Sequence, residues 1–145
     1  MISNKMVMCF LFSLALSLLL PGCVQDKYNK GADNVNFTNI GGFTGRDGQA
    51  RIRLISYSGE AEIENVKSYA DRLGCGMIFA YFYPESTDRN EIPIEELQSA
   101  RSFVEAREIL FKGEGYDKWH FAAQCLGMIP TVTDCQASPF STNCR

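Results

Sequence analysis

The stretch MIFAYFYP, residues 77–84, is a continuous apolar and aromatic run that ends in proline. A short run without polar alternation predicts a strand that is covered on both faces. Upstream, RIRLISYS, residues 51–58, alternates arginine with isoleucine and leucine and is rich in β-favouring side chains, which predicts another strand. The segment between these two strands decides how they pair.

A helix is predicted between the two strands. Ile63, Val66, Ala70 and Leu73 recur at helical spacing, and Gly74 follows them as a terminator. Strand, helix and strand in so few residues predict a right-handed parallel crossover. We therefore expect a sheet that is at least partly parallel.

A second helix and a closing hairpin are predicted further along. Pro93 is suited to open a helix, and apolar residues at helical spacing from 97 to 111 predict that the helix continues to that point. YDKWHFAAQCLG, residues 116–127, fits a strand or a helix. Because MIPTVTDC, residues 128–135, is strand-like, we expect a hairpin here.

These elements predict a small single α/β (α+β) domain over residues 50–145, with a β-α-β-α core and a C-terminal β-hairpin. Residues 24–49 are rich in Asn, Gly and Asp and have only scattered apolar side chains, so with Cys23 they are expected to form a flexible tether (23–49). Within it, GGFTGRDG, residues 41–48, lacks the Gly-Lys-Ser/Thr ending of a phosphate loop and predicts a turn leading into a strand.

The N-terminus has the parts of a secretory signal. Lys5 precedes an apolar run, residues 6–20, that is shorter than the ~20 residues of a membrane-spanning helix. The quartet that follows, LPGC at 20–23, resembles a bacterial lipobox, with Pro21 as a departure. The resemblance implies a signal peptide over residues 1–22 and acyl chains, palmitate among them, on Cys23. The alternative is a signal whose Cys23 is a plain thiol.

The lipid would determine where the protein resides. Two or three acyl chains on Cys23 give a durable membrane anchor. By resemblance to Gram-negative lipoproteins, Val24 in place of Asp favours the periplasmic side of the outer membrane. The chain has a net charge of −3, one unit more negative without Lys5, and no basic block. Neither nucleic acid nor an anionic membrane surface is therefore expected to attract the chain, and the lipid has to supply the anchor.

The cysteines predict two disulfides. The signal and the lipid account for two of the six cysteines, and an even number in an exported domain indicates disulfides, here with three possible pairings. We favour Cys135 with Cys144, which closes the short loop QASPFSTN, and therefore Cys75 with Cys125. A metal site is not expected, because no C-x2-C pair is present and the chain has one histidine.

No catalytic constellation stands out. His120, the single histidine, is a candidate general base, but a lone histidine in an aromatic segment is more often structural. There is no G-x-S-x-G elbow, so neither enzymatic activity nor a cofactor is expected. Aromatic side chains that reach the surface are favoured in protein interfaces. The candidate binding patch is Tyr83, Tyr116, Trp119 and His120.

The function expected from these features is that of a cell-envelope lipoprotein. It would act as a non-enzymatic binding module for another envelope protein or an incoming one, of the immunity, exclusion or inhibitor type. The alternative is a structural lipoprotein subunit of an envelope or secretion assembly. A hydrolase using His120 is the less favoured third hypothesis.

Overall fold

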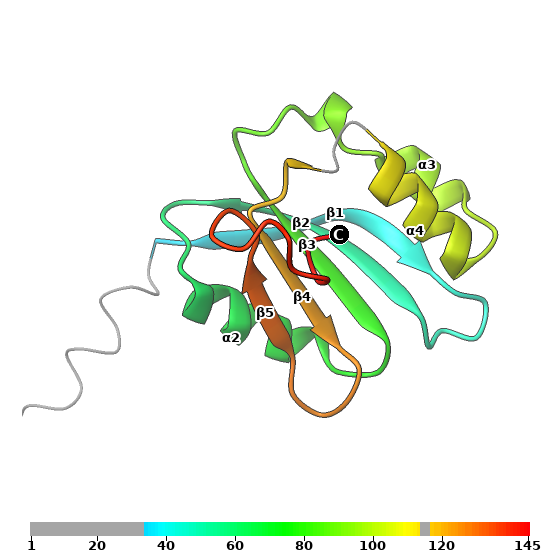
Figure 1. The fold of residues 1–145 in the computed structure, drawn as a ribbon, viewed down its shortest axis with the longest axis horizontal. Coiled ribbons are helices and arrows are strands. Elements are labelled where there is room, and N and C mark those ends of the chain that lie inside the picture. The colour runs from blue at the N-terminus through cyan, green and yellow to red at the C-terminus, as the bar shows by residue number, and fades with distance from the viewer. Residues whose placement is uncertain (1–33, 114–116) are drawn as a thin grey trace, which may run out of the picture. The chain divides into compact units, whose positions relative to one another are not determined.

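One five-stranded sheet organises the part of the chain that the structure describes (Figure 1). The structure is a computed structural model, and it describes residues 34–113 and 117–145. The strands lie in their order along the chain, β1-β2-β3-β4-β5. Among the described residues, the elements are β1 (Asn36–Thr44), β2 (Arg51–Ser58), α2 (Ile63–Leu73), β3 (Ile78–Pro84), a 3-10 helix (Arg89–Glu91), α3 (Ile94–Ser99), α4 (Phe103–Lys112), β4 (Phe121–Cys125) and β5 (Thr131–Asp134).

The sheet is mixed. β2 and β3 pair in parallel, and the other three neighbouring pairs are antiparallel. A parallel pair needs a crossover connection, and α2 supplies it between β2 and β3. The prediction of a small α/β domain with a β-α-β unit and a C-terminal hairpin, β4–β5, is therefore confirmed.

Helices cover both faces of the sheet. Successive residues of a strand point to opposite faces, so in β2 Ile55 packs with α2, whereas Leu54 packs with α3 and α4. In β3, Phe82 lies on the α2 face and Tyr81 and Tyr83 lie on the other. All three aromatic side chains are at most 3% exposed. β3 is thus buried on both faces, as its apolar run predicts.

β1 lies within the segment that composition assigns to a flexible tether. Residues Asn36–Thr44 pair with β2, and Phe43 is buried. Gly42 has a φ of 145°, and a Cβ there would collide with the carbonyl oxygen of Ile52. The glycines that this close approach requires interrupt the alternation that signals a strand. The tether expectation is corrected for β1, and residues 24–33 lie outside the described part.

The turn that GGFTGRDG predicts is present between β1 and β2. The amide of Gly45 donates to the carbonyl of Ala50 at 2.8 Å, and the amide of Gly48 donates to the carbonyl of Gly45 at 2.8 Å. The first two glycines of the stretch belong to β1, so the turn begins later than the motif.

The second helical segment consists of two helices, so the expectation of one helix through residues 97–111 is wrong. After α3 the chain is extended at Ala100, with ψ 138°. Ser102 then caps α4, because its Oγ accepts the amide of Glu105 at 3.1 Å, and the Glu105 carboxylate accepts the amide of Arg101 at 2.8 Å. An S-x-x-E pattern of this kind marks a helix start.

Two disulfides link segments that lie next to the strands of the sheet. Cys75 is bonded to Cys125, with the Cα atoms 5.0 Å apart, and Cys135 to Cys144, with the Cα atoms 5.6 Å apart. The first joins the α2–β3 connection to the end of β4, and the second closes the C-terminal loop. The prediction of two disulfides is confirmed, and the pairing is the one that the short C-terminal loop favours.

Several predicted features fall on residues that the structure does not describe. They are the signal peptide over residues 1–22, the lipidated Cys23 and Tyr116. Of the helices in the described ranges, none combines the length and the apolar character needed to cross a membrane.

We expect Gly42→Ala to lower the free energy of unfolding by about 1–3 kcal/mol, because it places a Cβ in a strained backbone region against Ile52. Gly127→Ala is the matched control, since Gly127 has no positive φ and a Cβ there meets nothing within 4 Å. Urea denaturation of the oxidised protein measures both. Equal midpoints for the two variants would contradict the packing of β1 on β2.

Candidate functional site

Two residues of the predicted aromatic patch are withdrawn from the surface. Tyr83 is fully buried and Trp119 is 3% exposed. The ring of Trp119 packs against Tyr81 with centroids 4.7 Å apart, inside the cluster that α3 and α4 cover. Burial raises the pKa of the Tyr83 hydroxyl. His120 alone of the four is described and partly exposed, since Tyr116 lies outside the described residues.

His120 joins three strands at one end of the sheet. Its Nδ1 lies 2.6 Å from the hydroxyl of Tyr57, on β2, and its Nε2 lies 3.6 Å from a carboxylate oxygen of Asp134, at the end of β5. The imidazole stacks on the ring of Phe121, the first residue of β4, with centroids 3.9 Å apart. We call Tyr57, His120 and Asp134 the His120 network.

The His120 network is poorly suited to nucleophilic catalysis. A hydroxyl beside an imidazole has the geometry of a nucleophile and its base. However, burial, and secondarily Asp134, raise the pKa of Tyr57 to about 12, which disfavours the phenolate. The Tyr57 side chain is also buried. Asp134 already accepts the amides of Gln136 and Ala137, at 2.9 and 3.0 Å. The geometry therefore favours a structural role for His120.

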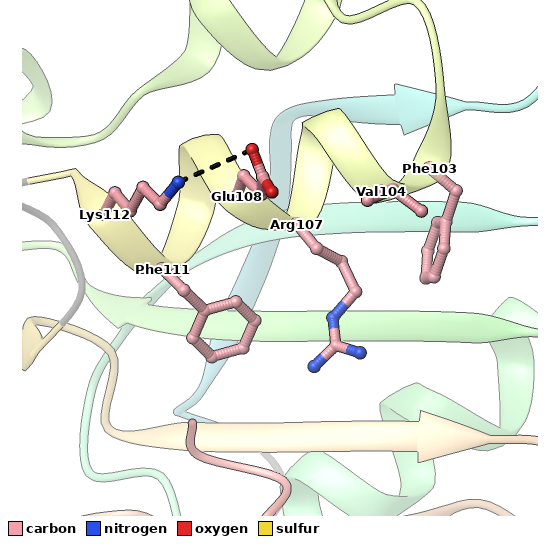
Figure 2. A pocket seen from close by; sticks show the side chains of 6 residues that line it. All are labelled: Phe103, Val104, Arg107, Glu108, Phe111 and Lys112. Carbon is pink, nitrogen blue, oxygen red and sulfur yellow. Dashed lines mark ion pairs between the residues drawn. The ribbon is translucent and has the colours of Figure 1, made fainter.

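A groove runs along one side of α4 (Figure 2). Its volume is about 380 Å³. We call it the α4 groove, and its lining residues are Phe103, Val104, Arg107, Glu108, Phe111 and Lys112.

The spacing of apolar residues along α4 explains the groove. Phe103, Arg107 and Phe111 are four residues apart, so their side chains follow one another along one side of the helix. Leu110 points into the core and is fully buried, whereas Val104 is 67% exposed. The apolar arc of α4 is therefore wider than the part that the sheet covers.

Arg107 is held in the α4 groove by aromatic rings. Its guanidinium carbon lies 5.2 Å from the ring centroid of Phe111 and 5.9 Å from that of Phe79, on β3. Phe79 also packs against Phe103, with centroids 5.3 Å apart. In Figure 2 the Arg107 side chain extends between Phe103 and Phe111. Across the described residues, no carboxylate lies within ion-pair distance of Arg107, so its charge is available to a partner.

The residues of the α4 groove are suited to binding. They offer apolar surface, two aromatic rings and a guanidinium, and no serine, cysteine or histidine lines the groove. Within the described ranges, no group of three or more His, Cys, Asp or Glu side chains is placed to hold a metal ion. The chemistry that the groove supports is recognition of an apolar segment beside an acidic group.

The sequence pattern places four of the groove residues, Phe103, Val104, Arg107 and Phe111, on the helical stripe expected from 97 to 111. The signal that distinguishes them is Arg107, an arginine that lies four residues from a phenylalanine on either side. A charged side chain in the middle of an apolar stripe marks the edge of the buried face, since charged groups are almost never fully buried without a partner.

Tyr57→Phe tests the structural role of the His120 network. Loss of the hydroxyl leaves Nδ1 of His120 without its partner, so we expect the free energy of unfolding at pH 7 to fall by about 1 kcal/mol. The folded pKa of about 12 exceeds the ordinary value of 10.0. The unfolded chain therefore loses this proton first, and wild-type stability falls as the pH rises from 10 towards 12. Between pH 10 and 12 the free energy of unfolding of the Tyr57→Phe variant should fall less than that of the wild type.

Urea denaturation at pH 7 and again between pH 10 and 12 measures both effects. Tyr69→Phe is the control, because it removes a hydroxyl from a half-buried tyrosine on α2. If the two variants behave alike at every pH, the hydrogen bond between Tyr57 and His120 does not stabilise the fold.

No model of a known protein family, no curated protein and no solved structure matches this chain. The α4 groove and the His120 network are therefore the basis on which its function is inferred.

Proposed function

We propose that this chain is a non-enzymatic binding module of the cell envelope. Acyl chains on Cys23 hold it on a membrane, and the α4 groove binds another envelope protein or an incoming one. Toxin immunity, phage or plasmid exclusion and enzyme inhibition are functions of this kind. The observation that carries the proposal is the arginine held between aromatic rings in an open groove.

The α4 groove contains residue types that dominate the energy of protein interfaces, namely aromatic side chains and arginine. Because the rings of Phe79 and Phe111 already hold Arg107, little side-chain freedom is lost when a carboxylate binds it. At the rim, Lys112 and Glu108 form an exposed ion pair at 3.5 Å. The partner segment that complements the groove presents an apolar side chain beside an Asp or Glu.

The His120 network supports binding over hydrolysis. Its hydroxyl is directed to the imidazole at 2.6 Å, and burial raises the pKa of Tyr57, which disfavours the phenolate that a nucleophile would need. The contacts of the network connect β2, β4 and β5, which indicates a structural role for these side chains.

Two features support the envelope as the location. Both disulfides are formed, and such bonds persist in oxidising compartments such as the periplasm. The LPGC quartet at 20–23 resembles a lipobox, and Val24 after it favours the periplasmic side of the outer membrane by the same resemblance.

Arg107→Ala should weaken binding of the partner by about 30-fold, the effect expected of a residue at the energetic centre of an interface. A photo-reactive amino acid at the exposed Val104 first identifies the partner in cells. Calorimetry with the purified partner then measures the affinities of the wild type and the variant.

Lys67→Ala, on the exposed side of α2, is the matched control and should leave the affinity unchanged. An Arg107→Ala variant that binds as tightly as the wild type would contradict a role for the α4 groove. Recovery of the chain in a large complex of fixed stoichiometry would favour a structural subunit instead.

The Cys23 anchor has a separate test. Intact mass spectrometry of the mature protein should find Cys23 as the first residue, with the added mass of acyl chains. Cys23→Ser should remove that mass and leave residues 1–22 attached, because the cysteine sulfur is the acceptor in a lipobox. An unmodified N-terminus in the wild type would contradict the anchor.

A further inference from the structure

Four large apolar side chains are exposed at one end of the sheet. Met128 and Ile129, in the β4–β5 turn, are 94% and 74% exposed. Leu126, after β4, is 62% exposed, and Met77, before β3, is 47% exposed. The disulfide at Cys125 holds together the two loops that carry them. We call Met77, Leu126, Met128 and Ile129 the tip.

The tip lies at the opposite end of the sheet from the start of β1. Asn36, at the start of β1, pairs with Ser58, at the end of β2. Cys125, at the end of β4, pairs with Ile78, at the start of β3. Because β2 and β3 are parallel, Arg51 at the start of β2 also lies at the tip end.

Acidic and basic side chains lie at opposite ends of the sheet, although the chain as a whole is acidic. Acidic side chains gather at the end away from the tip, where Arg89 and Lys118 offset part of their charge. Among them are Glu60, Glu62, Glu85, Asp88, Glu91 and Asp134.

The tip end is basic. Its arginines outnumber the nearby acidic residues, among them Asp47, Asp71 and Glu105. In the described part of the chain no carboxylate lies within ion-pair distance of any of these arginines. These arginines are Arg46, Arg51, Arg53 and Arg72.

A hollow of about 680 Å³ lies beside Arg51 and two residues of the tip, Met77 and Leu126. Arg51, Cys75, Met77 and Leu126 are among the residues that line it. The Nε of Arg51 is buried and has no hydrogen-bond partner in the described residues. Burial, and secondarily the charge of Arg51, lower the pKa of Arg53. An anion in the hollow would offset the repulsion between these two guanidinium groups.

We propose that the tip and this hollow dock on an anionic phospholipid surface. Headgroup phosphates bind in the hollow at Arg51, and the tip side chains enter the outer part of the acyl layer. Apolar side chains next to arginines match a bilayer interface, where hydrocarbon lies beneath anionic headgroups. The acidic residues of the other end lie away from the surface. This contact is separate from the α4 groove and does not depend on the proposed partner.

Tryptophan fluorescence with vesicles tests this contact. The full chain is prepared with Met128→Trp or, as the matched control, with Ser86→Trp, which lies beyond the end of β3 away from the tip. The buried Trp119 is a constant background in both. Each is mixed with vesicles of brominated phosphatidylcholine, alone or with phosphatidylglycerol. We expect the probe at 128 to shift to shorter wavelength and be quenched when phosphatidylglycerol is present, and the probe at 86 to be unaffected.

Arg51→Gln in the Met128→Trp chain should remove the dependence on phosphatidylglycerol, while Arg89→Gln, at the acidic end, should not. The proposal would be overturned if both probes were quenched or if neither were. It would also be overturned if the probe at 128 were quenched to the same extent by vesicles that lack phosphatidylglycerol. If vesicles leave the emission of the probe at 128 unchanged but a purified protein shifts it, the proposal is overturned in favour of a protein contact. Circular dichroism and an unchanged urea midpoint check that each variant is folded.

Discussion

The burial of β3 on both faces is the constraint on which the rest of the structure depends. Phe82 faces α2 and Tyr81 faces α3 and α4, and both are withdrawn from water. Burying a large apolar side chain contributes about 1.5–3 kcal/mol, so a strand with such side chains on both faces is stable only between two layers. The parallel partner β2 adds the need for a crossover, which α2 meets on one face. The segment after β3 must then cover the other face.

The α4 groove and the tip lie where the helices on the two faces of the sheet stop covering it. On one face, α3 and α4 contact β1, whereas on the other α2 contacts β4 and β5. The side of α4 towards Phe79 is therefore only partly covered, and Arg107 lies there between the rings that the helix and β3 provide. At one end of the sheet, two loops are joined by a disulfide and expose Met128 and its neighbours to solvent. Both surfaces are consequences of how a small domain buries one strand.

Much of the core could be predicted because the signals are local. Periodicity and terminators located β2, α2 and β3. β1 was missed because Gly42, required by its approach to β2, breaks the alternation of the strand. The periodicity does not show the division between α3 and α4, because the Ser102 cap lies inside an apolar stripe that is otherwise continuous. The α4 groove and the partners of His120 depend on tertiary packing. Periodicity shows that a stripe is apolar, but it does not show how much of it the sheet covers.

Native-state hydrogen exchange tests the central position of β3 most directly. The amides of β3 should exchange only through global unfolding, with a protection that equals the full free energy of unfolding. The amides of β1, at the edge of the sheet, should exchange faster through local opening. β3 amides that are no better protected than those of β1 would contradict a fold organised around a strand buried on both faces.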